Sequence, residues 1–275
     1  MGIIIAVLLF SFIIIFHELG HFLLAKKNGI RVDEFSLGLG PTLLGKQIGE
    51  TKFSLKLLPF GGACMMGEDD ADDLSEGSFN SKSVWARMSV VAAGPIFNLI
   101  LACVFCFILI MITGYRSPEI TGVLDGYSAQ EEGLQAGDVI TEINGRNVHI
   151  WDDVSLYTMT HADEAPFKVE YERDGKKYTA KLEPRQLEGD AAPLLGVTSG
   201  DIVKPGIFKS VEYSIYKVKY WMNYTVDSLR MLVTGQAGLK DLSGPVGIVN
   251  AVDDMYQEAA PAGFGVVMLS TVMVW

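Results

Sequence analysis

Two long apolar runs divide the chain into polar and mixed stretches. The first extends from Ile3 to Ala25 and is interrupted mainly at residues 17–21; the second extends from Ser89 to Thr113. As a helix, the first run is about 34 Å long, which is enough to cross the hydrocarbon of a bilayer. The pattern therefore predicts transmembrane helices over residues 1–27 and 84–114.

Between these runs, short stretches alternate apolar and polar residues. Val32–Leu37 and Lys52–Leu58 have the period-two pattern of strands, and turns rich in glycine and proline follow at Gly38–Pro41 and Pro59–Gly62. The segment is too apolar for a free loop and too rich in glycine for a spanning helix. Two interpretations are equally open: a small sheet that dips into the membrane and lines a cavity, or a hairpin packed for stability in the cytoplasm.

The rest of residues 28–83 is an acidic, polar loop from Glu68 onward, expected to be solvated. Residues 115–185 then have the composition of a soluble α+β domain. Trp151–His161 is the expected helix, and the alternation through Phe167–Leu182 predicts a hairpin. Two further histidines of this domain are not spaced as a site and are expected at the surface: His149 and His161.

Residues 186–261 begin as a connection rich in glycine and proline. Ile207–Thr234 then repeats apolar residues at helical spacing with lysines among them, which predicts an amphipathic helix on or across the outer interface. Leu239–Asn250 has no helical period. Residues 262–275 are apolar but shorter than the ~20 residues of a span, so we expect the start of a third transmembrane helix that continues past Trp275.

The positive charges predict how the chain is oriented in a membrane. Lysines and arginines flank residues 26–88, whereas the segment after the second run opens with only Arg116. The positive-inside rule therefore puts residues 26–88 in the cytoplasm and the domain from residue 115 outside. The net charge of −11 argues against nucleic acid as a partner, and membrane lipid is expected instead.

The first run contains ionisable residues that a membrane helix ordinarily lacks. His17 and His21 lie about 40° apart on one helical face, so they can share one metal ion, and Glu18 beside them can act as a general base. His17 would lie about 12 Å inside the end of the helix, and ionisable groups at that depth are costly and usually functional. The plain alternative is a chance match in a signal-anchor helix.

The second run contains one amide, Asn98, in otherwise apolar surroundings. Two uses are open for it. The side chain can form a hydrogen bond to a neighbouring helix, or its NH₂ group can stabilise the oxyanion that forms when water attacks a peptide carbonyl.

Five features of the chain belong together: H-E-L-G-H at 17–21, G-P-x-x-N at 94–98, the glycine-rich loop, G-L-x-x-G-D-x-I-x-x-I-N-G at 133–145 and L-S-G-P-V-G at 242–247. In this combination the chain resembles the site-2 protease family of intramembrane metalloproteases, of the bacterial regulator-of-sigma-E protease type. The resemblance implies a multi-pass α-helical membrane protein with a re-entrant β-loop and an inserted extracytoplasmic α+β PDZ domain. It further implies a place in the bacterial inner membrane, with the active site toward the cytoplasm.

The resemblance also implies roles for individual residues. His17 and His21 would bind one Zn²⁺, Glu18 would be the catalytic base and Asn98 would face the active site. The loop that guides substrate would include four glycines: Gly38, Gly40, Gly61 and Gly62. The family's third zinc ligand is an aspartate in an Asp-Gly pair on the third core helix; residues 262–275 have no such pair, so we expect it beyond Trp275.

The function implied is cleavage of transmembrane segments of substrate proteins, such as anti-sigma factors or remnant signal peptides. The PDZ domain would bind a peptide or a substrate ectodomain, or exclude bulky ones. A different class, a catalytically inactive membrane-anchored PDZ adaptor, is favoured by the missing aspartate. A metal transporter would need more intramembrane ligands than these helices supply.

Overall fold

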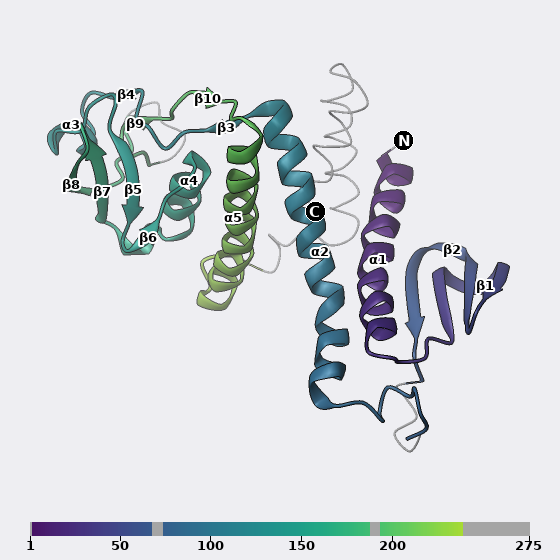
Figure 1. Cartoon of the computed structure of the whole chain (residues 1–275). Helices are drawn as coiled ribbons and strands as arrows, with labels where there is room; N and C mark the ends of the chain where they lie inside the picture. Colours follow the sequence, from purple (N-terminus) through teal and green to yellow (C-terminus); the bar gives the residue numbers. More distant parts are fainter. Residues whose placement is uncertain (1, 68–73, 188–192, 239–275) are drawn as a thin grey trace. The chain divides into compact units, whose positions relative to one another are not determined.

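The computed structural model describes residues 2–67, 74–187 and 193–238. These residues form two compact units: unit 1 contains the described residues up to Phe105, and unit 2 those from Cys106 onward (Figure 1). Three predicted segments lie outside the described residues: the centre of the acidic loop, the L-S-G-P-V-G stretch and the start of a third helix.

Unit 1 is built on two long helices, as predicted. They are α1, Gly2–Lys27, and α2, Val84–Thr113, which continues into unit 2. Both are long and apolar enough to cross a membrane, with mean hydropathies of 2.0 over Val7–Lys27 and 2.8 over all of α2. Many of their apolar side chains are exposed, as expected of helices that face lipid.

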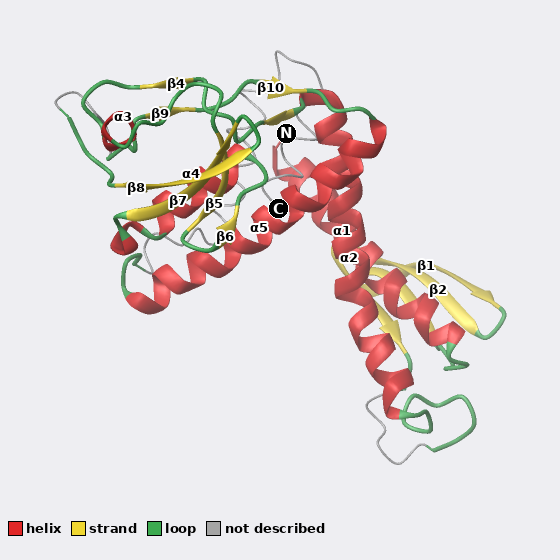
Figure 2. Cartoon of the chain, turned by 60° about the vertical axis from the view of Figure 1, so that its left-hand side comes forward, coloured by secondary structure: helices red, strands yellow, loops and turns green. Residues whose placement is uncertain are grey.

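The two helices lie side by side in both views (Figures 1 and 2). Gly20 allows this close approach, since a Cβ atom there would lie 2.6 Å from the carbonyl oxygen of Ala93. Small residues at a helix contact are the usual basis of packing within membranes. Phe16 and Phe97 add an aromatic contact, with ring centroids 5.8 Å apart.

The segment between α1 and α2 contains two long strands. They are β1, Glu34–Ile48, and β2, Thr51–Met65, and they pair antiparallel. Phe35 is paired with both Phe53 and Cys64, so the start of β1 lies between the two ends of β2. The prediction that turns end the strands at Gly38–Pro41 and Pro59–Gly62 is therefore wrong, because β1 and β2 bend at these residues and continue through them. Glycines with positive φ allow such bends.

The sheet of unit 1 packs one part of its surface on α1 and exposes another. Phe35 and Phe53 form an aromatic cluster with Phe22 of α1, with ring centroids 5.4 to 5.8 Å apart. Leu44, by contrast, is 70% exposed. It belongs to a set of large apolar side chains of β1 and β2 that are exposed: Leu39, Leu43, Leu44, Ile48, Leu55, Leu57, Leu58 and Met65.

Unit 2 contains an antiparallel sheet in the order β6-β5-β7-β8. The strands are β5 (Val139–Ile143), β6 (Arg146–Asn147), β7 (Phe167–Arg173) and β8 (Lys176–Leu182). The helix α4, Trp151–Thr160, packs on it, as the sequence predicts. The core is closed by fully buried side chains from the sheet: Ile140, Ile143, Phe167, Val169 and Leu182.

Short elements extend unit 2 beyond the predicted domain end at residue 185. The strand β3 (Tyr115–Arg116) pairs with β10 (Ile202–Val203), and β4 (Gly122–Val123) pairs with β9 (Val197–Thr198). The small helices are α3, Ser128–Glu131, and a 3-10 turn, Ala162–Glu164. The stretch expected to be only a linker therefore supplies two strands of the unit.

The last described helix, α5, spans Ile207–Thr234, the range predicted for an amphipathic helix. Ionic contacts hold it on α4 and β6: Lys217 bonds Asp152 (2.9 Å) and Asp227 bonds Arg146 (2.8 Å). His161, expected at the surface, is buried, because it stacks on Tyr157 with centroids 4.3 Å apart. Phe208, on the other face of α5, is 91% exposed.

We expect Asp138→Ala to loosen the sheet of unit 2. The Asp138 side chain is buried and accepts hydrogen bonds from Arg173 Nε (2.6 Å) and from the Gln135 backbone N–H (2.8 Å). Losing these charge-assisted bonds should cost about 2 kcal/mol. Amides of β5 and β7 should then exchange hydrogen roughly thirtyfold faster in the purified full chain. Glu142→Ala is the control, and unchanged exchange in Asp138→Ala would contradict this expectation.

Candidate metal centre

Two histidine rings of α1 point at one place on α2. His17 and His21 have ring centroids 4.8 Å apart, with the rings at 78° to each other. A Cβ atom built on Gly94 of α2 would lie 2.5 Å from Nε2 of each histidine. The absence of a side chain at Gly94 therefore lets both Nε2 atoms approach α2 at the same place, and two imidazole nitrogens so close together can bind one zinc ion.

The opposite nitrogen of His21 is held by the backbone of α2. Nδ1 of His21 lies 2.7 Å from the carbonyl oxygen of Val90, which can only accept a hydrogen bond. The ring proton is therefore on Nδ1, and the lone pair of Nε2 is available for a metal. Such a partner behind a metal-binding histidine fixes both the tautomer and the orientation of the ring.

Asn98 has the corresponding position behind His17. Its amide nitrogen lies 3.2 Å from Nδ1 of His17, while its Oδ1 is buried with no hydrogen-bond partner. The oxygen and nitrogen of an amide are assigned from the hydrogen-bond network. If the two are exchanged, Oδ1 accepts a hydrogen bond from the Nδ1–H of His17, and the lone pair of Nε2 of His17 is available for a metal. The NH₂ group then takes the buried position at which Oδ1 has no hydrogen-bond partner.

Glu18 lies about 100° around α1 from His17 and is turned toward the sheet. A Cβ atom on Gly62 of β2 would lie 3.1 Å from Cγ of Glu18 and 3.3 Å from Cγ2 of Ile14. The strand therefore passes directly over the carboxylate-bearing side chain. Of the predicted catalytic and metal residues, the structure thus brings His17, His21 and Asn98 together on the α2 side and Glu18 beside them on the β2 side.

The four predicted loop glycines fall into two groups. Gly38, Gly40 and Gly61 have φ of +85°, +87° and +90°, so the bends of β1 and β2 account for them. A side chain on Gly38 would also collide with the carbonyl oxygen of Leu58. Gly62 is different, because it has no positive φ and instead contacts Glu18.

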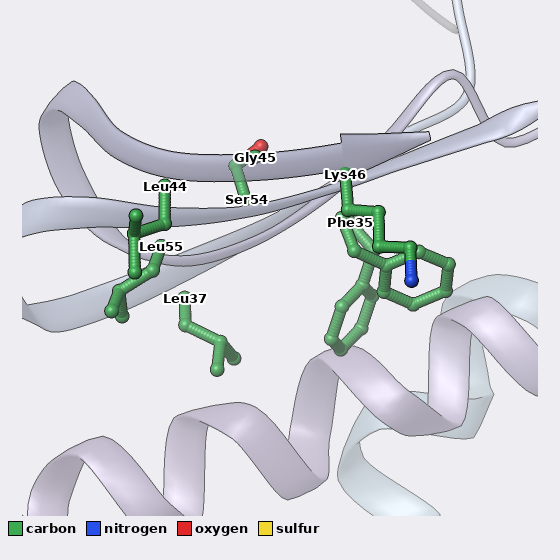
Figure 3. Close-up of a pocket in the computed structure, with 8 residues that line it drawn as sticks. Phe35, Leu37, Leu44, Gly45, Lys46, Ser54 and Leu55 are labelled. Atoms are coloured by element: carbon green, nitrogen blue, oxygen red, sulfur yellow. The ribbon is translucent and has the colours of Figure 1, made fainter. Parts of the chain in front are cut away.

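A groove lies one strand away from Gly62. Leu37, which is paired with Gly62, lines it together with Phe35, Leu44, Phe53 and Leu55, and its volume is about 350 Å³. Figure 3 shows Leu37 and Phe35 pointing from the sheet toward the helix, with Leu44 and Leu55 closing the far side. Apart from Lys46 and Ser54, the side chains that line the groove are apolar, and it can accept a large aliphatic or aromatic side chain.

The donor set fits a zinc site in part. Two imidazole nitrogens directed at one point are typical zinc ligands, and a catalytic site has a third protein ligand plus water. Among residues 2–67, 74–187 and 193–238, no group of three or more histidine, cysteine, aspartate or glutamate side chains is placed to hold a metal. The third ligand expected beyond Trp275 therefore stays a prediction.

Sequence reasoning missed two parts of this centre. The sequence predictions include neither the space at Gly94 nor the hydrogen bond from His21 to the Val90 carbonyl. A signal was present, because Gly94 and Asn98 are four residues apart and so lie on one face of α2, as His17 and His21 do on α1.

The chain is similar to known proteins over most of its length. The sequence pattern of peptidase family M50 matches residues 5–275. A candidate zinc metalloprotease of Clostridium acetobutylicum is 38% identical over 263 residues, which cover 96% of this chain and 76% of that protein. The regulator of sigma-W protease RasP of Bacillus subtilis is 28% identical over 333 residues, covering 90% of this chain and 79% of that protein.

One solved structure is similar to part of the chain. It is the PDZ domain of an SdrC-like protein from Listeria monocytogenes, with 24% identity and a TM-score of 0.25, covering 32% of this chain and 87% of that domain. The PDZ identity of residues 115–185 therefore stays a prediction from the sequence.

We expect Gly94→Ala to prevent metal binding, because the added methyl group would lie 2.5 Å from Nε2 of both histidines and would displace the two rings. The measurement is zinc per purified chain, which should fall at least tenfold. Ala92→Val is the matched control, since it adds a larger group on the exposed side of the same turn. Normal zinc content in Gly94→Ala would show that the histidines do not share a metal at this point.

Proposed function

This chain belongs to peptidase family M50, the site-2 protease family, and is a zinc metalloprotease; on this premise we propose that it cuts transmembrane segments of other proteins inside the bilayer. The observation that carries the proposal is the convergence of His17 and His21 on Gly94, between two helices apolar enough to cross a membrane. A hydrolytic centre on such helices meets substrates that are themselves in the membrane.

The chain's own residues divide the chemical work. Zinc, when bound, polarises the scissile carbonyl and lowers the pKa of its bound water. Glu18, next in sequence to His17, accepts a proton from the attacking water and passes it to the leaving nitrogen. The Val90 carbonyl and Asn98 hold the two histidine rings with Nε2 toward the centre.

The sheet of unit 1 provides a means of presenting the substrate. A peptide carbonyl within a helix is occupied by its own hydrogen bonds, so the substrate must be extended at the cleaved bond. Near Gly62, β2 has β1 as its only strand partner among the described residues. We propose that the substrate adds as a strand beside Gly62 and that the apolar groove at Leu37 takes one of its side chains.

The same proposal covers substrate class and location. The Bacillus subtilis relative is named as a regulator of sigma-W, so anti-sigma factors are one expected substrate class, with remnant signal peptides the other. We place the chain in a bacterial inner membrane, surrounded by lipid, with residues 26–88 on the cytoplasmic side. Unit 2 is then extracytoplasmic, where a PDZ domain would bind a peptide or filter substrates by the size of their ectodomain.

We expect Glu18→Gln to abolish cleavage while zinc stays bound. The amide keeps the size of the side chain but cannot take a proton, and general base catalysis contributes about 10²–10⁴-fold. The assay is cleavage of a reconstituted transmembrane substrate, with zinc content measured on the same sample. Glu76→Gln, at an exposed carboxylate, is the control. Wild-type cleavage by Glu18→Gln would refute the mechanism.

We expect two substitutions of Asn98 to affect zinc differently. Asn98→Asp keeps an acceptor for Nδ1 of His17, whereas Asn98→Leu removes it. Loss of a partner behind a metal-binding histidine typically weakens binding 10–100-fold. Zinc affinity should therefore fall by that factor in Asn98→Leu and stay near wild type in Asn98→Asp. If Asn98 acts only on the oxyanion, both variants will bind zinc normally and lose turnover.

A further inference from the structure

The end of α2 opens on a small pocket within unit 2. Its volume is about 200 Å³. The last turns of the helix line it at Leu109, Ile110 and Thr113, and Arg116 and Lys217 line it as well. In Figures 1 and 2 the end of α2, β3, β10 and the start of α5 lie together here. The pocket thus joins apolar residues of a membrane helix to cationic residues of the domain that follows it.

The position of these charges along the chain is informative. No charged residue occurs between Arg87 and Arg116, so Arg116 is the first one beyond the apolar part of α2. A cation at that point lies at the level of lipid headgroups, where phosphates are found. Tyr115 beside it stacks on Tyr213, with ring centroids 3.7 Å apart, and tyrosine is enriched at the same level of the membrane.

The polar groups of the pocket favour an anion. The Lys217 side chain is only 16% exposed, and its ammonium bonds the Asp152 carboxylate at 2.9 Å. Arg116 is exposed and bonds the neutral Ser199 hydroxyl at 3.3 Å; within the described residues it makes no ion pair. The two cations and one carboxylate leave one positive charge in excess, and it is carried mainly by Arg116.

We propose that this pocket binds the phosphate of an anionic glycerophospholipid, with Arg116 and Lys217 as the donors and the acyl chains beside Leu109. Guanidinium is well suited to phosphate, because it donates parallel hydrogen bonds to two oxygens. A headgroup that carries an ammonium group is disfavoured. The carboxylate of the pocket that could pair with that ammonium group, Asp152, already forms an ion pair with Lys217. A bound lipid would connect the end of α2 to α4 and α5, and so brace unit 2 where it meets the membrane.

The test is lipid binding to the purified full chain in detergent, measured by native mass spectrometry. Phosphatidylglycerol and phosphatidylcholine with identical acyl chains are titrated separately. We expect tighter binding of phosphatidylglycerol, reduced five- to tenfold by Arg116→Gln and less by Arg116→Lys, which keeps the charge but loses the paired hydrogen bonds. Lys176→Gln, at the tip of the β7–β8 hairpin, removes the same charge away from the pocket and should have no effect.

Two results would overturn the proposal. One is equal binding of the two lipids, or binding of phosphatidylglycerol that Arg116→Gln does not change. The other is displacement of the lipid by millimolar inorganic phosphate, which would show a site for a soluble anion. Zinc content should be unchanged in Arg116→Gln, so failure of the lipid site is distinguishable from failure of the metal centre.

Discussion

The centre of unit 1 depends on hydrogen bonds that reach from α2 to the back of the histidine rings on α1. An imidazole binds metal through one nitrogen only if the other carries the proton. The Val90 carbonyl sets this for His21, and Asn98 is placed to set it for His17. In a low-dielectric membrane such contacts also satisfy polar groups that would otherwise be costly to bury. The same contacts between α1 and α2 therefore pack the two helices and orient the histidine rings.

Three glycines of unit 1 provide the space that the close contacts around this centre require. Gly20 lets the helices approach, Gly94 leaves space where both Nε2 atoms point, and Gly62 lets β2 pass over Glu18. Each contact involves a different partner, and each would be closed by a single methyl group. The three glycines thus allow the close contacts on which the proposed metal centre and the proposed substrate path depend.

Much of this was predictable from local pattern. Helical spacing alone put His17 and His21 on one face, and apolar periodicity gave the bounds of α5. The role of Gly94 was not predictable in this way, because it depends on the register between two helices far apart in sequence. The strands β1 and β2 were predicted too short, since glycines that usually mark turns here bend continuous strands. The two-residue strands β9 and β10 have no periodicity to detect.

The central claim is that His17 and His21 bind one zinc ion through Nε2. Zinc-edge X-ray absorption of the purified, zinc-loaded protein tests it most directly. The account predicts two imidazole nitrogens at about 2.0–2.1 Å, with oxygen ligands completing the shell, and loss of both imidazole contributions in a His17→Ala, His21→Ala double variant. Sulfur ligands at about 2.3 Å, or a spectrum unchanged in the double variant, would contradict it.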